Sequence, residues 1–252
     1  MSDAALQSSM PPASLQQLPP AAARFCLGIQ RFMEQELGLR LAGQKILVAF
    51  SGGADSSALL HCLFYLAPRA GFELVAAHLD HALRPSSAKE AGDCLALCRK
   101  LGIEAVQLRL DVKNLAHERG LGLEEAGRLA RYDFFNRTAK EFSCSLVATG
   151  HTANDLAEDV LMRLARGSGW PALAGMRGRD DTRKLIRPLL LTTRADIEAF
   201  VASLGLGWIE DESNQDKRFL RNRVRSCLLP LFLEANPAFR RGGRAVASGA
   251  PG

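Results

Sequence analysis

Short, nearly all-apolar runs alternate with longer stretches of helical periodicity along much of the chain. The first helical stretch covers residues 21–37, where apolar side chains recur every three or four positions. From residue 45 onward, brief apolar runs appear at regular intervals. Such runs are typical of strands that are covered on both faces of a sheet. The pattern predicts strands at residues 45–50, 72–78, 105–108 and 145–149.

Helical stretches follow these predicted strands in a regular order. Strands that alternate with helices of this length imply right-handed crossover connections and therefore a parallel sheet. The predicted fold class is α/β, with a doubly wound parallel sheet. The helices that we expect lie at residues 56–66, 87–101, 124–142 and 153–166.

The regular alternation weakens after Gly167. Residues 187–190 form a candidate short buried segment. Thr193 is a candidate cap for a helix that ends near Gly205, and residues 220–233 form a last predicted helix. We divide the chain into a flexible leader (1–20), a catalytic ATP-binding domain (21–185), a mostly helical C-terminal part of the catalytic core (186–238) and a low-complexity tail (239–252).

Three of the predicted strands end in polar or glycine-rich segments, at residues 51–57, 78–84 and 150–159. In doubly wound sheets, ligands bind outside the carboxyl ends of the strands. The carboxyl ends of parallel strands meet at one edge of the sheet. We therefore expect the three segments to converge on a single site.

The composition is that of an ordinary globular protein, with 47% hydrophobic and 23% charged residues. No apolar run reaches the roughly 18 residues that a membrane helix needs. The N-terminal segment lacks the basic start and apolar stretch of a secretory signal, so we expect a cytoplasmic protein without membrane contact. The six cysteines include no Cys-x-x-Cys pair, and we interpret them as buried, reduced thiols.

The net charge of +5 is small but unevenly distributed. Clustered cations suggest a phosphate-bearing partner, either a nucleotide or a nucleic acid. A solvated surface is the alternative, and charge alone does not decide between them. The cluster near the end of the chain consists of Lys217, Arg218, Arg221, Arg223, Arg225, Arg240, Arg241 and Arg244.

The first polar segment has the composition of a phosphate-binding loop. Its glycines allow a tight turn that brings backbone N–H groups close to an anion, and the following helix adds the positive end of its dipole. Two serines can donate hydrogen bonds to phosphate oxygens, and the aspartate can bind Mg²⁺. The structural alternative is a glycine turn whose polar side chains cap the helix. The candidate ATP-binding residues are Ser51, Gly52, Gly53, Ala54, Asp55 and Ser56.

This Ser-Gly-Gly-x-Asp-Ser sequence after a first strand resembles the signature of the PP-loop family of ATP pyrophosphatases. It lacks the Gly-Lys-Ser/Thr ending of a Walker A loop and the glycine spacing of a dinucleotide fold. The resemblance implies a PP-loop type of sheet with a helical C-terminal appendage. It also implies cleavage of ATP between the α and β phosphates, which yields an adenylated substrate and pyrophosphate. The family includes GMP synthetases, NAD synthetases, tRNA thiolases and tRNA(Ile)-lysidine synthases.

Later segments resemble the lysidine synthase members in particular. The resemblance implies ATP and Mg²⁺ as cofactors, and L-lysine and an isoleucine tRNA with a CAU anticodon as partners. ATP adenylates the C2 carbonyl oxygen of the wobble cytidine, the lysine amine then attacks C2, and AMP leaves. The oligomeric state is not implied. The matching segments are residues 78–85, 124–132, 150–158, 166–176, 210–214 and 221–225.

The resemblance also implies roles for individual side chains. His151, Asp155 and Glu158 fall close to one helical face, where the two carboxylates can hold a lysine ammonium, bind Mg²⁺ or accept a proton from the amine. Arginines of the family motifs can stabilise phosphate charge or bind the tRNA backbone. The candidate catalytic residues are Asp55, Arg131, His151, Asp155, Glu158, Arg221 and Arg225, and the candidates for tRNA or phosphate contact are Arg221, Asn222, Arg223 and Arg225.

His78, Asp80 and Gly150 are further candidates for ATP binding. Two interpretations remain open for His78 and His81, because either can contact the nucleotide or merely satisfy a backbone group nearby. Asp80 is expected to be functional. The Mg²⁺ ligand that we expect is Asp55.

Two features depart from the lysidine synthase pattern. Asn154 replaces the first acid of an Asp-Asp pair, and Asp159 stands where a threonine is common. Because Asn carries no charge, the change weakens a role for position 154 in binding Mg²⁺ or lysine. The match also fades at Asn236–Pro237, where lysidine synthases usually continue into more helices. We expect a complete catalytic core with weakened capture of tRNA.

Three alternatives are open. A tRNA thiolase of the same fold usually needs cysteines that carry sulfur, and the absence of Cys-x-x-Cys argues against it. A glutamine-fed synthetase is disfavoured because the sequence shows no glutaminase domain. A degenerate paralogue that binds ATP or RNA without turnover is supported by Asn154 and the faded end. The retained Asp55, Asp155 and Glu158 argue against it.

Overall fold

The structure is a computed structural model that describes residues 12–82, 86–209, 220–236 and 239. Its centre is a six-stranded sheet in the order β3-β2-β1-β4-β6-β5, in which every neighbouring pair except β5–β6 is parallel. The predicted doubly wound α/β class is confirmed. The strands are β1 (Lys45–Ala49), β2 (Glu73–Asp80), β3 (Glu104–Arg109), β4 (Leu146–Ala148), β5 (Arg179–Asp180) and β6 (Leu185–Ile186).

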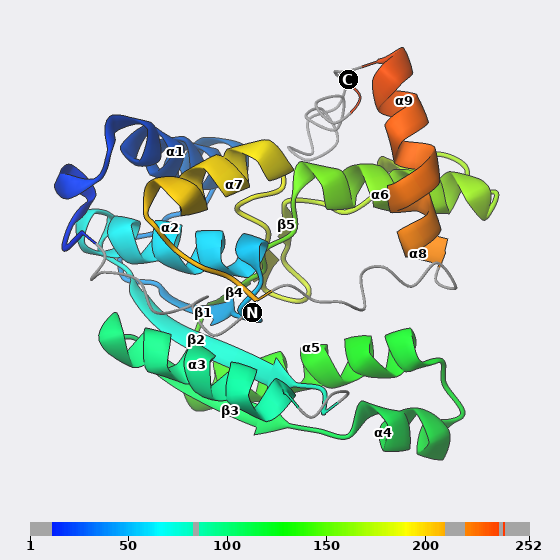
Figure 1. The fold of residues 1–252 in the computed structure, drawn as a ribbon, viewed down its shortest axis with the longest axis horizontal. Coiled ribbons are helices and arrows are strands. Elements are labelled where there is room, and N and C mark those ends of the chain that lie inside the picture. Colours follow the sequence, from blue (N-terminus) through cyan, green and yellow to red (C-terminus); the bar gives the residue numbers. More distant parts are fainter. Residues whose placement is uncertain (1–11, 83–85, 210–219, 237–238, 240–252) are drawn as a thin grey trace.

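The sheet is covered on both faces, as the apolar strands predict. Ile46 and Val48 of β1 pack in a core with helices on one face, whereas Leu47 packs with Phe134 and Phe135 on the other. This alternation follows from the two-residue repeat of a strand. In Figure 1, α1, α2 and α7 lie above the sheet and α5 lies below it. These helices are α1 (Pro20–Arg31), α2 (Ala54–Ala70), α5 (Leu123–Glu141) and α7 (Arg194–Ser203).

Most predicted elements are confirmed, but two small features were not predicted. Helix α4 (Val112–Arg119) buries only Val112 and Ala116, so it leaves almost no apolar period in the sequence. Strands β5 and β6 have two residues each, which is too short for a pattern to emerge. The predicted buried segment at residues 187–190 follows β6, and all four of its side chains are buried. The remaining long helices, α3 (Ser87–Lys100) and α6 (Ala153–Ala165), lie where we expected helices.

A group of C-terminal helical segments packs against α6. The predicted helix at 220–233 is present as α8 (Leu220–Arg223), a π-helical turn η5 (Val224–Leu228) and α9 (Leu229–Ala235). Val224 and Leu229 are buried together with Ala157 and Leu161 of α6. Figure 1 shows α9 crossing α6 at the side of the molecule away from α1. The connection 210–219, which contains one matching motif, lies outside the described residues.

The predicted domain limits stay predictions. Within the predicted leader, residues 12–20 include the short helix η1 (Leu15–Gln17), and Leu15 and Leu18 are buried in the main core. The rest of the leader and nearly all of the predicted tail lie outside the described residues. None of the helices in the described part of the chain is long and apolar enough to cross a membrane.

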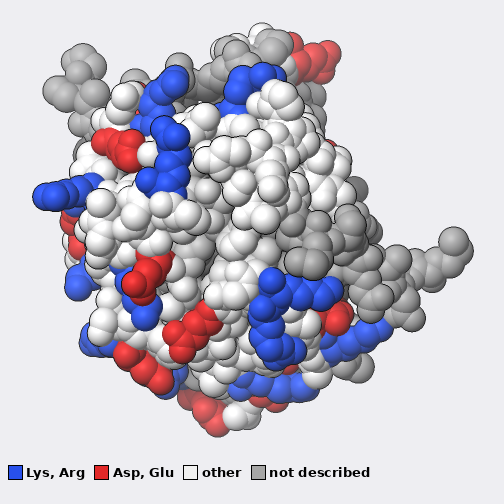
Figure 2. Space-filling view, turned by 90° about the vertical axis from the view of Figure 1, so that its left-hand side faces the viewer, with Lys and Arg blue, Asp and Glu red and all other residues white. Residues whose placement is uncertain are grey.

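Basic and acidic side chains are interspersed on the face of the molecule in Figure 2. A broad region of uncharged residues lies between them. Side chains of opposite charge that lie close together do not produce an electrostatic potential of one sign. The excess positive charge of the chain is therefore not concentrated on this face.

Candidate active site

A cavity of about 500 Å³ opens at the carboxyl ends of β1, β2 and β4. All three polar segments contribute to its wall, as predicted from the parallel order of the strands. It lies where the connections from the sheet turn to opposite sides, between β1 and β4, which is where doubly wound sheets bind ligands. Its volume falls within the range of ligand pockets, roughly 300–1,000 Å³. The lining residues from the three segments include Ser51, Asp55, Ser56, His78, Asp80, Gly150 and His151.

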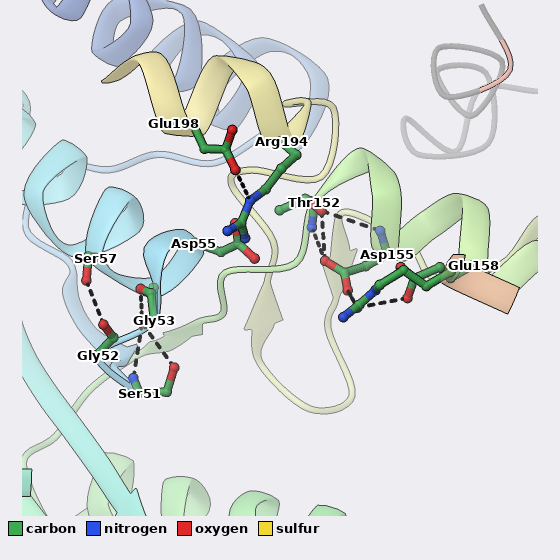
Figure 3. Close-up of polar contacts among 12 residues, drawn as sticks. Ser51, Gly52, Gly53, Asp55, Ser57, Thr152, Asp155, Glu158, Arg194 and Glu198 are labelled. Atoms are coloured by element: carbon green, nitrogen blue, oxygen red, sulfur yellow. Dashed lines mark hydrogen bonds and ion pairs between the residues drawn. The ribbon is translucent and has the colours of Figure 1, made fainter. Parts of the chain in front are cut away.

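The phosphate loop connects β1 to the first turn of α2. Gly52 has a φ of 82°, a left-handed conformation that favours glycine, and Gly53 caps α2. The Ser56 hydroxyl donates to the Gly53 carbonyl at 3.0 Å and accepts from the Ser51 N–H at 3.2 Å. These bonds fix the turn (Figure 3). Gly52, Gly53 and Ala54 shape the loop but are not part of the cavity lining, while Ser51, Asp55 and Ser56 are.

Gly150 allows β4 and α2 to approach each other closely. A Cβ atom at Gly150 would lie 3.2 Å from the backbone C and O atoms of Asp55 and from the backbone N of Ser56. Backbone neighbours cannot move away as a side chain would. Glycine is therefore required here because the loop after β4 must pass against the phosphate loop. Gly150 also lines the cavity, beside the predicted ATP-binding residues Ser51, Asp55 and Ser56.

The N-terminal ends of α2, α6 and α7 lie around Asp55 (Figure 3). Thr152 begins α6 and Thr193 begins α7, each with a reciprocal capping box to an Asp three residues later. The Ala153 N–H of α6 donates to the Thr192 carbonyl before α7 at 3.0 Å, which links the two helix starts. Each helix N-terminus carries about half a positive charge. Together they favour an anion beside the phosphate loop.

Asp55 forms an ion pair with Arg194 of α7, with 3.2 Å between Oδ1 and Nη1. Desolvation raises the pKa of Asp55 above its usual value, although Arg194 acts in the opposite direction. Arg194 was not among the candidates from the sequence. The sequence feature that could have identified Arg194 is its place as the first residue of a capped helix, because a cation there opposes the helix dipole.

His78, Asp80 and His81 line the end of the cavity at β2. The His78 ring hydrogen-bonds through Nδ1 to the Phe50 carbonyl at 2.9 Å, and desolvation lowers its pKa. This bond matches the interpretation of His78 as a residue that satisfies a backbone group, and its ring still faces the cavity. The Asp80 side chain is 0% exposed, accepts from the Ala82 N–H at 2.8 Å and lies 3.6 Å from Arg109. Asp80 thus lies buried in the cavity wall, and its functional role stays a prediction.

His151 follows β4 and lines the cavity beside the start of α6. Its Nδ1 is 2.8 Å from the Thr149 hydroxyl, which in turn lies 3.5 Å from the Ile186 carbonyl. The Thr149 hydroxyl can donate either to this carbonyl or to Nδ1, so the two contacts fit both neutral tautomers of His151. Desolvation and the positive charges of Arg187, Arg221 and Arg131 lower the pKa of His151 to about 4, despite the nearby Asp155. The imidazole is therefore neutral at pH 7.

The two carboxylates of α6 are paired with arginines of the C-terminal helices (Figure 3). Arg221 donates through Nη2 to Asp155 and through Nε to Glu158, the latter at 2.9 Å. Arg225 donates to both oxygens of Glu158, at 2.6 and 3.1 Å. Burial opposes ionisation of Asp155, but Arg221 outweighs it and holds the pKa of Asp155 below its usual value. The carboxylates thus position arginines rather than standing free in the cavity.

The remaining candidates lie in different places. Arg131 and Asn222 line the cavity with Arg221 and Arg225. Arg223 is exposed and is not part of the lining. The Asn154 side chain also lies outside the lining, and its buried Oδ1 has no hydrogen-bond partner among the described residues.

No cluster of three His, Cys, Asp or Glu side chains suited to a metal ion occurs among the described residues. Mg²⁺ in nucleotide enzymes is usually bound by one or two carboxylates together with substrate phosphates. Asp55, on the phosphate loop, supplies one such carboxylate. The residues present therefore fit a Mg²⁺ ion that arrives with ATP.

Two relatives with similar sequences carry the same name. The chain is 51% identical over 193 residues to a protein of Nitratidesulfovibrio vulgaris named tRNA(Ile)-lysidine synthase, covering 77% of this chain and 56% of that protein. A protein of Thermosipho africanus with the same name is 38% identical over 215 residues, covering 84% of this chain and 50% of that protein. The chain spans about half the length of the curated relatives that it matches.

Solved structures share the fold at low sequence identity. A U34-tRNA thiolase from Methanococcus maripaludis matches with a TM-score of 0.72 at 19% identity, covering 90% of this chain and 78% of that chain. An NMN synthetase from Francisella tularensis matches with a TM-score of 0.53 at 13% identity, covering 89% and 91%. A family model described as a PP-loop domain matches residues 25–232. The sheet order, the Ser51–Ser56 loop and this match agree, and the chain belongs to the PP-loop domain family.

Proposed function

We propose that the chain carries the catalytic core of a tRNA(Ile)-lysidine synthase. The reaction joins L-lysine to C2 of the wobble cytidine in an isoleucine tRNA with a CAU anticodon, and it consumes ATP. The observation that carries the proposal is one cavity whose wall combines the phosphate loop with the His151 and arginine–carboxylate cluster of α6 and α8. The names of the relatives support the same reaction. We also propose that the reaction takes place in the cytoplasm.

The first step is adenylation of the base. The cytidine O2 attacks the α-phosphorus of ATP, the bond to the β-phosphate breaks, and pyrophosphate leaves. Backbone N–H groups of the loop and the dipole of α2 stabilise the phosphates without reorganisation. Mg²⁺ bound at Asp55 would screen the phosphate charge. His78 and Asp80 lie at the other end of the cavity, where the nucleoside part of ATP fits.

The second step is attack of the lysine amine on C2, with loss of AMP. An amine must be neutral to attack, so a nearby group has to accept its proton. Nε2 of His151 has no hydrogen-bond partner among the described residues, and we assign it the acceptor role, with Nδ1–H donating to the Thr149 hydroxyl. It can orient the attacking amine by accepting a hydrogen bond from it. With a pKa of about 4, His151 is a weak base, so it positions the amine while the proton passes to water or to the departing AMP.

The arginine–carboxylate cluster has a separate task. Glu158 is 1% exposed and binds both Arg221 and Arg225, so it fixes their guanidinium groups at the cavity. Positioned guanidiniums stabilise phosphate charge on AMP as it leaves. Arg131 and Asn222 extend this surface, and the exposed Arg223 is placed to contact the tRNA backbone. We also propose that residues 21–185 form the ATP-binding domain and that residues 186–238 complete the catalytic core.

The test is AMP release from ATP by the purified chain, with and without lysine and the CAU isoleucine tRNA. The proposal expects AMP only when both are present, together with radiolabelled lysine in the tRNA. A methionine tRNA with the same anticodon is the matched control. Incorporation of sulfur instead of lysine would replace the proposal with a thiolase. ATP binding without AMP under any condition would contradict catalysis by this chain.

A further inference from the structure

Arg194 lies beside the phosphate loop but outside the cavity wall. Its Nη1 donates to Asp55 at 3.2 Å, and its Nε donates to Glu198 of the same helix at 2.7 Å (Figure 3). Its Nη2 has no hydrogen-bond acceptor among the described residues. The side chain is 45% exposed. The guanidinium is thus held between Glu198 and Asp55, and its Nη2 is the group left to bind a further acceptor.

The helix dipole disfavours an arginine at position 194, although the i,i+4 pair with Glu198 is favourable. Arg194 is the first residue of α7, where the helix dipole is positive and a cation is unfavourable. Thr193 and Asp196 already cap this end with reciprocal hydrogen bonds, so Arg194 is not needed to satisfy the backbone there. A cation that opposes the dipole fits a position where an anionic ligand arrives. In the structure, Asp55 supplies the anion.

We propose that Arg194 is a phosphate-binding residue that Asp55 holds until ATP enters, and that it then binds the terminal phosphates. This inference rests on the proposed function. The triphosphate brings more negative charge than one carboxylate and attracts Arg194, which leaves the Asp55 carboxylate to bind Mg²⁺. An arginine fork is suited to phosphate oxygens. Arg221 and Arg225 line the cavity wall and Arg194 does not, so we assign Arg194 to the β and γ phosphates rather than the α phosphate.

The role in the reaction follows from this placement. As cytidine O2 forms its bond to the α-phosphorus, the bond from the α-phosphorus to the bridging oxygen breaks. The electron pair stays on that oxygen, which becomes part of pyrophosphate. Negative charge therefore grows on the leaving group, where Arg194 binds. Arg194 stabilises the negative charge on the departing pyrophosphate, while Arg221 and Arg225 stabilise the charge on the phosphate of AMP.

The test is a set of binding measurements by calorimetry that uses neither tRNA nor lysine. Arg194→Gln keeps a polar side chain but removes the charge, and Arg194→Lys keeps the charge without the fork. Arg137→Gln is the control, because it removes an arginine from an exposed i,i+4 pair on α5. The ligands are pyrophosphate, α,β-methylene-ATP and AMP. Loss of one charge-assisted contact predicts about tenfold to a hundredfold weaker binding of the first two ligands to Arg194→Gln.

AMP binding should not change in Arg194→Gln, and Arg137→Gln should bind all three ligands like the unmodified protein. Arg194→Lys should fall between the two. Unchanged pyrophosphate binding in Arg194→Gln would overturn the proposal. Equal loss of AMP and pyrophosphate would also overturn it, because it would show that Arg194 only builds the loop. If Arg194→Gln does not fold, the affinities of Arg194→Lys for pyrophosphate and for AMP are compared instead. Unchanged pyrophosphate binding, or an equal loss for both ligands, would again overturn the proposal.

A double-mutant cycle with Asp55→Asn tests the exchange of partners, with pyrophosphate as ligand and EDTA present. Removing the Asp55 charge should tighten pyrophosphate binding more when Arg194 is present than in the Arg194→Gln background. Additive effects would overturn the idea that Asp55 restrains Arg194. These binding measurements require neither tRNA nor catalysis. They can therefore be interpreted even if no AMP release is observed, and the two proposals can fail separately.

Discussion

Arg225 binds Glu158 in a bidentate manner, with its Nε 2.6 Å from Oε1 and its Nη2 3.1 Å from Oε2. Glu158 is 1% exposed on α6, whereas Arg225 belongs to the turn η5 that precedes α9. Arg221 donates to the same carboxylate at 2.9 Å. One buried carboxylate therefore joins the C-terminal helices to α6 and orients two guanidiniums at the cavity.

Replacing Glu158 by Ala should destabilise the protein and release the C-terminal helices. Removal takes a shared buried carboxylate from two partly buried arginines, while the bond from Arg221 to Asp155 remains, which predicts a loss of about 2–3 kcal/mol in the free energy of unfolding. Asp159→Ala is the matched control, because Asp159 pairs within α6 with Arg163 at 2.9 Å and should cost less than about 1 kcal/mol. Urea titration measures both. Limited proteolysis of Glu158→Ala should cut near residues 220–235, and equal stability of the two variants would contradict this role.

Gly52→Ala should disrupt the phosphate loop. An added Cβ would lie 2.6 Å from Cδ1 of Ile209 and 2.8 Å from Sγ of Cys94, and the φ of 82° disfavours any side chain. We expect a destabilisation of about 1–3 kcal/mol, together with weaker ATP binding.

Gly28→Ala is the control for that substitution. Gly28 lies within α1 with nothing within 4 Å of an added Cβ, so alanine should stabilise the protein by about 0.5–1 kcal/mol. Thermal unfolding and calorimetric titration with an ATP analogue distinguish the two sites. Normal ATP affinity in Gly52→Ala would show that the loop tolerates the added methyl group.

His151 should make the protein less stable in mild acid. Its pKa is about 4 in the folded protein and near 6.5 when unfolded, so the unfolded chain binds the extra proton first. Stability is fully present above about pH 6.5 and falls as the pH drops toward 4, by at most about 1.4 kcal/mol per pH unit. His61 and His78 contribute with the same sign, because their pKa values are also lowered.

Urea midpoints between pH 4.5 and 7.5 measure this slope, and His151→Gln should make it shallower. The comparison uses the slope rather than the absolute stability, because the substitution also removes the bond to Thr149. The NMR titration of the His151 ring should show a midpoint well below 6.5. A His151 midpoint near 6.5 would contradict the neutral acceptor that we assign to it.

Asp55→Ala should abolish AMP formation while the protein stays folded. The side chain is 33% exposed and its ion pair with Arg194 lies near the surface, so the change in stability should be less than about 1 kcal/mol. Asp133→Ala removes a comparable exposed pair on α5 and should leave AMP formation unchanged. AMP release and thermal unfolding are measured on both variants. Unmodified turnover in Asp55→Ala would remove Asp55 from the mechanism.

The sequence by itself determined the α/β class, most helices and strands, and the edge of the sheet at which the site lies. These features depend on local patterns, because strand and helix periods are set by neighbouring residues and parallel strands place their carboxyl ends together. The loop from Ser51 to Ser56 could be assigned for the same reason. Helix α4 and strands β5 and β6 escaped prediction because they bury too few residues to leave a period.

Only the tertiary structure decided which charges meet. Arg194 and Asp55 are 139 positions apart, and Arg221 and Glu158 are 63 apart. The chain holds 32 basic and 27 acidic residues, so the sequence allows far more pairings than the fold uses. The energy of an ion pair depends on the distance and the solvent between two groups, and both are set by how helices pack on the sheet. The packing of α7 and the C-terminal helices therefore pairs the two carboxylates of α6 with arginines and brings Arg194 to the phosphate loop.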